Sequence, residues 1–335
     1  MLNRQIAIKG KYTRIYLKIA IFQLLEIENV KINWKPLIAY QKGEYLKRYP
    51  FPDIERIFNN LEAMLEENRI PSRVLVTNGR VRGFAYLIDN PLFHGRINGY
   101  ICFPEPNLYS DESLTGIIKW MISTGIQRKS DVAIQDISGA AVNDGVIVAE
   151  GFEMLERTGM RIQIPSGHEN HAQVPEGFEF SDFSSFDFQE YLDAQWNAYS
   201  STVDSRFLIP ENRRERSELL RTVIDGSFGE IIYEASLLAR YRGKLAGAIL
   251  VCSGMSRTDM SRIPLIEDLF VSREFRRRGI GTHLLSRALE NLRNASYRSA
   301  ELAVSSGNPA LRIYERSGFI KYGPPERMYL KKLTE

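Results

Sequence analysis

Residues 269–281 read Leu-Phe-Val-Ser-Arg-Glu-Phe-Arg-Arg-Arg-Gly-Ile-Gly, a short apolar strand that runs into a basic, glycine-punctuated turn. The pattern predicts a helix from Thr282 to about Leu292. Gly279 and Gly281 lack a Cβ atom, so the backbone can bend tightly there, and the helix start presents unpaired N–H groups. Because such a terminus beside arginines favours an anion, the segment predicts a pyrophosphate-binding turn.

A second signal lies further along the chain and marks another short helix. Asn308 suits its N-cap, Pro309 its first position and Gly318 the residue just past its end. Residues 300–304 before it have a strand pattern, and a further strand is predicted from Ile320. The order strand, phosphate turn, helix, strand, helix, strand is therefore expected between residue 265 and the C-terminus.

At these residues the chain resembles the Gcn5-related N-acetyltransferase (GNAT) superfamily. Arg276, Gly279 and Gly281 occupy the fixed positions of its Gln/Arg-x-x-Gly-x-Gly/Ala signature. The Asn…Tyr…Gly-Phe pattern of the family's last helix is matched by Asn308, Tyr314, Gly318 and Phe319. The resemblance covers the chain from about Phe178 to the C-terminus.

The resemblance implies acetyl-CoA as the acyl donor, held between two parallel strands that end near Val271 and Val304. It also implies that Asn308 contacts the pantetheine arm and that Tyr314 is the general acid that protonates the leaving thiolate. The cofactor-binding residues predicted in this way are Leu269, Phe270, Val271, Arg276, Arg277, Arg278, Gly279, Ile280, Gly281, Thr282 and Asn308.

Glu267 and Asp268, just before the predicted pantetheine-binding segment 269–271, are the candidates for the base that would receive the proton of the amine. Strand alternation would place the two carboxylates on opposite faces, and Glu267 is favoured because it would share a face with Leu269 and Val271. The pair also resembles that of diamine acetyltransferases, in which the glutamate binds or deprotonates the amine. The alternatives are proton loss through water and a strand-end carboxylate that pairs with a nearby arginine.

The length of 335 residues is comfortable for two domains, and the sequence suggests an internal duplication. Residues 78–85 parallel 242–248, and residues 155–160 parallel 314–319 at nearly the same offset, which aligns Leu155 with Tyr314. The first half lacks both the phenol and an Arg-x-x-Gly-x-Gly turn. It is interpreted as a degenerate copy, and the alternative is an unrelated α/β domain.

The predicted fold is α/β, with two tandem GNAT-like domains that each have a mixed, mostly antiparallel central sheet flanked by helices. The expected divisions are a degenerate domain over 1–165, a polar linker over 166–177 and a catalytic domain over 178–335. The stretches 186–199 and 213–224 are expected to be amphipathic helices near the acceptor site, and residues 241–244 a hairpin turn.

Composition favours a cytoplasmic protein with no nucleic-acid or membrane partner. The formal net charge is +3, and two cysteines, Cys102 and Cys252, do not make a disulfide framework. The apolar run 15–27, read as an amphipathic helix, is too short to span a bilayer. No metal is expected, because no cysteine or carboxylate cluster joins His168 and His171. The oligomeric state is left open.

These observations predict an N-acetyltransferase that moves an acetyl group directly from acetyl-CoA to a primary amine. A polyamine, an amino sugar, a free amino acid and a peptide N-terminus all remain open as acceptors, with a lean toward a small cationic amine. Two alternatives are kept. One is a non-catalytic acyl-CoA-binding regulatory module, and the other is a tandem acyltransferase that resembles mycothiol synthase.

Overall fold

The computed structural model describes residues 23–25, 32–48, 54–77, 80–164, 174–200, 202–210, 212–227, 229–256 and 261–334. They form two compact units. The N-terminal unit contains the chain up to Met154 together with residues from Arg327 onward, and the C-terminal unit contains Leu155–Glu326.

The N-terminal unit has a five-stranded sheet in the order β1-β2-β3-β4-β5. Its last strand pairs on its free side with the end of β13 through Tyr329, Leu330 and Lys331. The bounds of its elements are β1 Gln23–Leu25, α1 Trp34–Leu46, α2 Ile54–Glu66, β2 Ser72–Thr77, β3 Arg80–Asp89, β4 Arg96–Cys102, a 3₁₀ turn Pro106–Leu108, α3 Asp111–Arg128, β5 Asp131–Ser138 and α4 Asp144–Ala149.

Two apolar clusters place the helices of this unit on opposite faces of its sheet. Residues of α3 and α4, among them Met121 and Ile147, pack on one face with Ile97 and Ile134. Residues of α1 and α2, among them Trp34 and Phe58, pack on the other face. The alternation of buried side chains along β3 and β4 serves both clusters.

The C-terminal unit has a sheet in the order β6-β12-β11-β10-β9-β7, and the short strand β8 also pairs with β10. The bounds of its elements are β6 Glu153–Gln163, β7 Phe178–Asp182, α5 Phe188–Tyr199, α6 Val203–Phe207, α7 Arg213–Ile224, β8 Glu230–Ile231, β9 Leu237–Tyr241, β10 Lys244–Met255, β11 Arg262–Val271, α8 Ile280–Asn294, β12 Ser299–Ser305, α9 Leu311–Arg316 and β13 Ile320–Lys331. Three 3₁₀ turns cover Phe183–Ser185, Tyr233–Ala235 and Arg273–Phe275.

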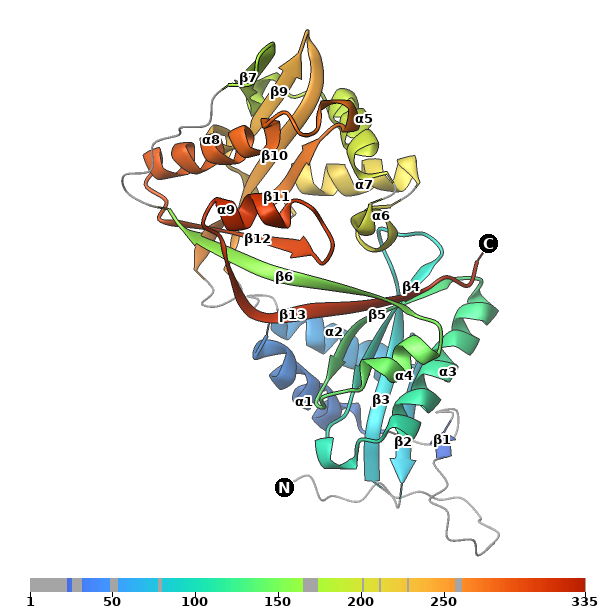
Figure 1. Ribbon diagram of the computed structural model, residues 1–335. Helices are drawn as coiled ribbons and strands as arrows, with labels where there is room; N and C mark the ends of the chain where they lie inside the picture. The colour runs from blue at the N-terminus through green and yellow to red at the C-terminus, as the bar shows by residue number, and fades with distance from the viewer. Residues whose placement is uncertain are drawn as a thin grey trace, which may run out of the picture. The chain divides into compact units, whose positions relative to one another are not determined.

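The sheet of this unit is also covered on both faces, as Figure 1 shows. The helix α8 has a strongly amphipathic pattern, and its apolar side, with Leu284 and Leu289, packs with Tyr314 of α9 on one face. On the other face α5 and α7 pack through residues such as Tyr191 and Leu220. The predicted fold, two GNAT-like copies with mostly antiparallel sheets between helices, is confirmed.

The two units repeat the same order of elements, from β1 and β7 at one edge to α4 and α9. Each of these last helices ends at a glycine with positive φ, Gly151 at +83° and Gly318 at +93°, and a phenylalanine follows. The alignment of Leu155 with Tyr314 is therefore wrong, because Leu155 lies in strand β6. The counterpart of Tyr314 is Ile147, whose carbonyl accepts the N–H of Phe152 as that of Tyr314 accepts the N–H of Phe319.

The boundary between the two compact units differs from the boundary between the two sequence repeats. Residues 155–163 of β6 belong to the C-terminal unit, because they pair with β12 from Arg157–Ser305 to Gln163–Ser299. Residues 327–334 belong to the N-terminal unit. The predicted boundary near 165 follows the repeat, whereas the packing boundary follows the strand pairing. Most of the predicted linker, residues 166–173 of 166–177, lies outside the described residues.

Several local predictions can be compared with the structure. The hairpin turn is confirmed: Arg242 and Gly243 both have positive φ, which suits a type I′ turn between β9 and β10. The helix predicted over 15–27 is wrong where it can be checked, because Gln23–Leu25 pair with β2 as a strand. None of the helices in the described part of the chain combines the length and apolarity that a membrane crossing requires.

Candidate functional site

The parallel strands β11 and β12 of the C-terminal unit separate soon after they meet. Among the described residues their pairing is confined to Leu265 and Glu301. Beyond that bridge, β11 continues for six residues to Val271 and β12 for four residues to Ser305. Backbone groups alternate between the two sides of a strand, and the N–H of Ser272 bonds to the carbonyl of Ala246 in β10, so the backbone of Phe270 also faces β10. The N–H groups of Leu269 and Val271 lie on the open side of β11 and are available to a ligand. This is the place where the resemblance predicts the pantetheine arm.

The N-terminus of α8 follows β11 and has the features that favour an anion at a helix start. Its N-cap residue, Gly279, has φ of +83°, a conformation that glycine adopts without strain. No side chain among the described residues caps this helix, and its first turn contains no acidic residue. The first internal bond joins the N–H of His283 to the carbonyl of Gly279, so the N–H groups of Ile280, Gly281 and Thr282 have no helical partner.

The three arginines of the turn before α8 lie in two different environments. The Arg276 guanidinium donates to the carbonyl of Val271 at 3.1 Å and to that of Ala198 at 2.5 Å. Arg276 therefore fixes the loop against β11 and α5, and burial followed by the charge of Arg273 lowers its pKa. Arg277 and Arg278 are exposed at the start of α8, where their charges can meet phosphate oxygens.

Gly281 lies at the mouth of the separated strands. A Cβ atom built on it would be 3.6 Å from Cδ1 of Ile313 in α9 and 3.7 Å from Cγ2 of Val271 in β11. These are ordinary van der Waals distances, so a methyl group fits. A larger side chain would extend into the space between β11 and α9.

Tyr314 lies in α9 and is 7% exposed, packed in the cluster under α8. The helix ends in a Schellman motif, in which the N–H of Phe319 bonds to the Tyr314 carbonyl and that of Gly318 to the Glu315 carbonyl. The rings of Tyr314 and Phe319 are 5.9 Å apart. Burial, reinforced by the charges of Asp268 and Asp204, raises the pKa of the Tyr314 phenol well above its ordinary value.

Asn308 precedes α9, which begins later than predicted. Its Oδ1 accepts the N–H of Ala310 at 2.9 Å, which makes a local turn two residues before the helix. Its Nδ2 donates to Oδ2 of Asp204 at 2.9 Å, and the other carboxylate oxygen of Asp204 accepts the Ser305 hydroxyl. Since both amide atoms are engaged, contact with a pantetheine arm would fall to the Asn308 backbone.

A β-bulge interrupts β11 at the proposed base. The register with β10 pairs Leu250 with Asp268 and Val251 with Ile266, which leaves Glu267 without an opposite residue. The strict alternation on which the preference for Glu267 depended does not hold across this bulge. Glu267 is exposed, whereas Asp268 is 8% exposed.

Asp268 is fully engaged on the face covered by α5. Its Oδ2 accepts the hydroxyl of Tyr191 at 3.0 Å and Nε2 of Gln195 at 2.7 Å, and its Oδ1 accepts the hydroxyl of Tyr199 at 2.7 Å. Burial raises the pKa of Asp268 against the lowering effect of these three bonds. This cluster was not predicted from the sequence, although Tyr191, Gln195 and Tyr199 recur at the spacing of one helix face.

We expect Asp268→Ala to lower the free energy of unfolding of the C-terminal unit by about 3 kcal/mol, because the buried Tyr191 and the partly buried Gln195 and Tyr199 lose their acceptor. The adjacent Glu267→Ala is the matched control and should change the same quantity by no more than about 0.5 kcal/mol. Urea denaturation followed by circular dichroism measures both. Equal effects of the two substitutions would contradict the assignment of Asp268 as the structural carboxylate of the pair.

The corresponding strands of the N-terminal unit are closed. Strand β4 pairs with β5 at seven positions, from Arg96–Asp131 to Cys102–Ser138. Helix α3 is capped by Ser110, whose hydroxyl accepts the N–H of Ser113, and its first turn contains Asp111 and Glu112. A closed strand pair and an acidic, capped helix start do not suit a phosphate-bearing ligand. That this half is a degenerate copy stays a prediction.

The remaining candidates for chemistry are few. The described residues contain no group of three or more His, Cys, Asp and Glu side chains placed to hold a metal ion. His168 and His171 lie outside the described residues. His283 is 2% exposed and packs 4.3 Å from the ring of Phe180. Burial raises the pKa of both cysteines to about 12, which disfavours a thiolate nucleophile at neutral pH.

Comparison with known families agrees with this geometry. Residues 221–329 match the family model described as an acetyltransferase (GNAT) domain. The match runs from α7 into β13 and so includes the phosphate turn and Tyr314. This part of the chain belongs to the GNAT superfamily. A 79-residue stretch is also 35% identical to an uncharacterized N-acetyltransferase of Methanocaldococcus jannaschii, a match that spans 23% of this chain and 35% of that protein's length.

Solved structures share the fold over both units. A GCN5-related N-acetyltransferase from Sphaerobacter thermophilus is similar over 90% of this chain and 91% of its own, with a TM-score of 0.55 and 18% identity. A glucosamine N-acetyltransferase region of a fungal multi-domain GH3 β-N-acetylglucosaminidase covers 93% of this chain, with a TM-score of 0.52 and 13% identity. That match spans 38% of the fungal chain. At these identities the likeness concerns the fold.

Proposed function

We propose that the C-terminal unit is an acetyl-CoA-dependent N-acetyltransferase that transfers the acetyl group directly to a primary amine. One observation carries the proposal. The uncapped N-terminus of α8, with Gly281 beside it, opens at the point where β11 and β12 separate. A pyrophosphate at the helix start and a pantetheine arm along β11 satisfy the unpaired backbone groups of both elements.

In the proposed reaction the protein must polarise the thioester carbonyl, protonate the leaving thiolate and accept the proton of the amine. The amine nitrogen attacks the thioester carbonyl, the new C–N bond forms, the C–S bond breaks, and the thiolate that leaves takes up a proton. Of the two candidate N–H groups, at Phe270 and Val271, that of Val271 lies on the open side of β11 and would polarise the carbonyl. The Tyr314 phenol would give its proton to the thiolate and recover it from solvent. The proton lost by the amine would pass to Glu267, directly or through water.

The different surroundings of the two carboxylates support Glu267, and not Asp268, as the group that binds or deprotonates the amine. Three side chains of α5 occupy the oxygens of Asp268. Glu267 stands beside it in the bulge and is exposed. An exposed carboxylate at this place would attract a cationic amine, which supports a small cationic acceptor among the candidates.

The test is release of CoA thiol from acetyl-CoA by the purified protein across a panel of polyamines, amino sugars, amino acids and peptides. Release that depends on the amine would support the transferase. Tight acetyl-CoA binding with no release for any amine would overturn it in favour of a non-catalytic acyl-CoA-binding module. Release from longer acyl-CoA donors alone would favour an acyltransferase of another donor class.

We expect Glu267→Gln to lower kcat/KM for a cationic amine at neutral pH by about tenfold, because the substitution removes the carboxylate that attracts and deprotonates the amine. The dissociation constant of acetyl-CoA should not change. The matched control is Glu234→Gln, another exposed glutamate of the unit. Steady-state rates at saturating acetyl-CoA measure the effect, and equal values for both variants would assign proton removal to water.

A further inference from the structure

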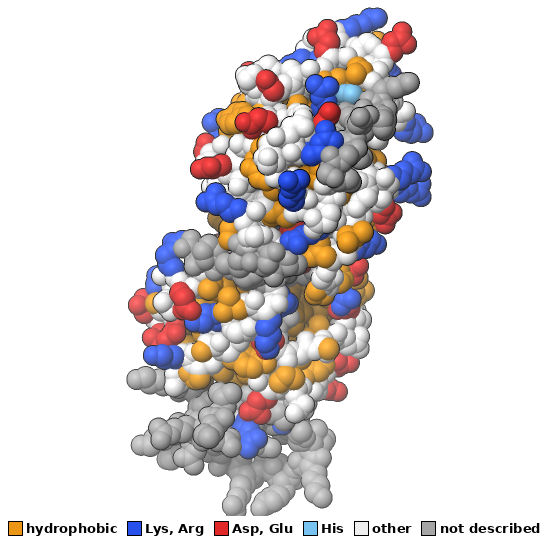
Figure 2. Space-filling model, turned by 90° about the vertical axis from the view of Figure 1, so that its left-hand side faces the viewer, with side chains coloured by type: hydrophobic (Ala, Val, Ile, Leu, Met, Phe, Trp, Pro, Cys, Tyr) orange, Lys and Arg blue, Asp and Glu red, His pale blue; other side chains and the backbone are white. Residues whose placement is uncertain are grey.

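A buried carboxylate anchors the connection between β12 and α9, residues 306–310. Charged side chains gather at the surface, as Figure 2 shows for one face of the molecule, whereas Asp204 of α6 is 7% exposed. Its Oδ2 accepts Nδ2 of Asn308 at 2.9 Å, and its Oδ1 accepts the hydroxyl of Ser305, the last residue of β12. The charge of the carboxylate strengthens both bonds. Asp204 therefore fastens the end of β12 and the middle of the connection to α6.

Further hydrogen bonds lead from this anchor into α9. The N–H of Ala310 bonds to Oδ1 of Asn308 at 2.9 Å, and the Asn308 carbonyl accepts the N–H of Leu311 at 3.2 Å. The Ala310 carbonyl in turn accepts the N–H of Tyr314 at 3.1 Å. A short chain of hydrogen bonds thus joins Asp204 to the residue proposed as the general acid.

The N-terminal unit holds the corresponding connection, between β5 and α4, in a different way. There, Oδ1 of Asn143 also accepts the N–H two residues further on, that of Gly145, at 3.1 Å. Its Nδ2, however, donates to Oδ2 of Asp111 at 3.1 Å, and its N–H donates to the hydroxyl of Tyr109. Asp111 is the first residue of α3. In this unit the connection is therefore tied to the start of the helix that corresponds to α8.

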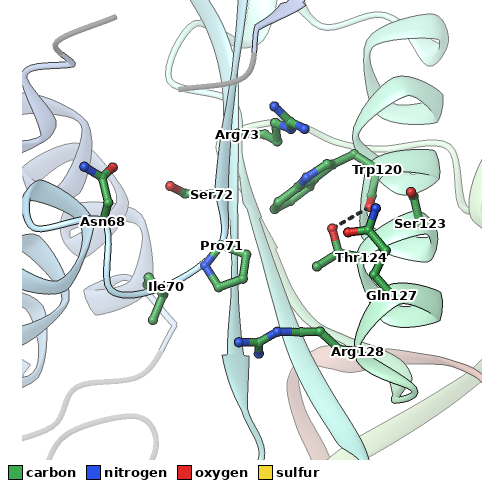
Figure 3. Close-up of a pocket in the computed structure, with 10 residues that line it drawn as sticks. All are labelled: Asn68, Ile70, Pro71, Ser72, Arg73, Trp120, Ser123, Thr124, Gln127 and Arg128. Atoms are coloured by element: carbon green, nitrogen blue, oxygen red, sulfur yellow. Dashed lines mark hydrogen bonds between the residues drawn. The ribbon is translucent and has the colours of Figure 1, made fainter. Parts of the chain in front are cut away.

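These side chains occupy the start of α3. A cavity of about 630 Å³ in this unit is lined by residues of the segment 68–73 and of α3 from Trp120 to Arg128 (Figure 3), so it does not reach the first turn of α3. In the C-terminal unit the asparagine amide bonds to α6 instead, and no side chain among the described residues caps α8. The partner of the asparagine thus differs between an occupied helix start and an open one.

We propose that Asp204 is a positioning residue of the acetyl-CoA site, an inference that rests on the function proposed above. Its carboxylate holds the connection 306–310 toward α6, which leaves the start of α8 free for the pyrophosphate. The same bonds set the first turn of α9 and hence Tyr314. Asn308 would act through Asp204, with its amide engaged there and not on the pantetheine arm. Asp204 itself would touch neither acetyl-CoA nor the amine.

The decisive variant exchanges the donor and the acceptor of this bond. In the exchange variant, Asp204→Asn together with Asn308→Asp, the amide at 204 donates to the carboxylate at 308 and still accepts the Ser305 hydroxyl. The carboxylate at 308 still accepts the N–H of Ala310. In Asn308→Asp alone, two carboxylates replace a bonded pair whose atoms lie 2.9 Å apart, and their repulsion would push the connection away from α6.

The test uses the full-length protein, with acetyl-CoA as the probe in calorimetric titration. We expect Asn308→Asp to bind acetyl-CoA at least about tenfold more weakly, and the exchange variant to bind within about threefold of the wild type. Ser205→Ala is the matched control in the same helix. Ser205 is buried and its hydroxyl donates to the Thr202 carbonyl, so this variant should bind as the wild type does.

Circular dichroism of each variant separates loss of the site from loss of the fold. If Asn308→Asp does not fold, the exchange variant still decides the matter, because its hydrogen bonds are restored. The proposal is overturned if the exchange variant does not fold or binds at least tenfold more weakly than the wild type, since Asn308 would then be needed for itself. Wild-type affinity in a folded Asn308→Asp variant would overturn it as well.

Turnover gives a second readout, which a purely structural role would not move in the same way. With an amine that supports CoA release, Asn308→Asp should lower kcat at saturating acetyl-CoA by at least about tenfold, and the exchange variant should restore it. Combined with Tyr314→Phe, Asn308→Asp should lower kcat no further, and additive losses would overturn the link from Asp204 to Tyr314. If no amine supports release, the proposed function fails, while the acetyl-CoA affinities still decide the role of Asp204.

Discussion

Replacement of Gly281 by tryptophan is expected to abolish acetyl-CoA binding. The position of its Cβ lies between Val271 and Ile313, at the mouth of the separated strands. An indole there would occupy the place of the pyrophosphate and hide the N–H groups of the first turn of α8. Loss of two charge-assisted hydrogen bonds costs about 4 kcal/mol, so we expect an affinity about a thousandfold lower. Calorimetric titration with acetyl-CoA measures it.

The matched control is Gly281→Ala, whose methyl group would meet Ile313 and Val271 at 3.6 and 3.7 Å. Because these distances are ordinary contacts, this variant should keep acetyl-CoA affinity within about threefold. The thermal transition of both variants shows whether α8 still packs. Unchanged binding in a folded Gly281→Trp variant would remove this turn from the cofactor site.

The turn before α8 and the helices around it could be predicted from the sequence because their determinants are local. A glycine with positive φ, a run of arginines and an apolar period along α8 lie within a few residues of one another. The end of α9 is equally local, since the Schellman motif uses Tyr314, Gly318 and Phe319 alone. Its start was predicted too early because Asn308 makes a turn before the helix instead of capping it.

The carboxylates of the site could not be predicted in the same way, because their surroundings come from distant segments. Asp204 joins Ser305 and Asn308 across a long stretch of sequence. The bulge at Glu267 depends on the register of β10 against β11, and no residue type in the sequence marks it. The roles of Glu267 and Tyr314 are still predictions that the kinetic experiments must decide.

The sequence also could not predict which of the two units the strands β6 and β13 pair with. A strand of alternating pattern such as β6 or β13 can pair with either copy of a duplicated fold, since the two copies offer similar edges. In this chain, β6 pairs with β12 of the C-terminal unit and the end of β13 with β5 of the N-terminal unit. Partly buried polar contacts accompany these pairings. Arg161 of β6 bonds to Glu301 of β12, and Tyr329 of β13 bonds to Asp144.

Replacement of Tyr314 by phenylalanine is expected to lower kcat by about a hundredfold, the usual effect of removing a general acid. Acetyl-CoA affinity should stay nearly unchanged, because phenylalanine keeps the ring that packs under α8 beside Phe319. The raised pKa keeps the phenol protonated beyond its ordinary value of about 10. The variant should therefore be impaired equally from about pH 6 to pH 9, with no recovery on the alkaline side. Steady-state rates with the best amine of the panel, taken across this range, measure the effect.

Tyr297→Phe is the matched control, since this tyrosine packs against the same cluster and has no proposed role in the reaction. Its rate should equal that of the wild type. A Tyr314→Phe variant as active as this control would show that the thiolate leaves without help from a phenol. A weaker chemical step in Tyr314→Phe should also make turnover depend on the leaving group, so acetyl thioesters of more acidic thiols should restore part of the lost rate. A packing defect would lower the rate for every thioester by the same factor, and this difference separates an acid in the reaction from a side chain that only supports the fold.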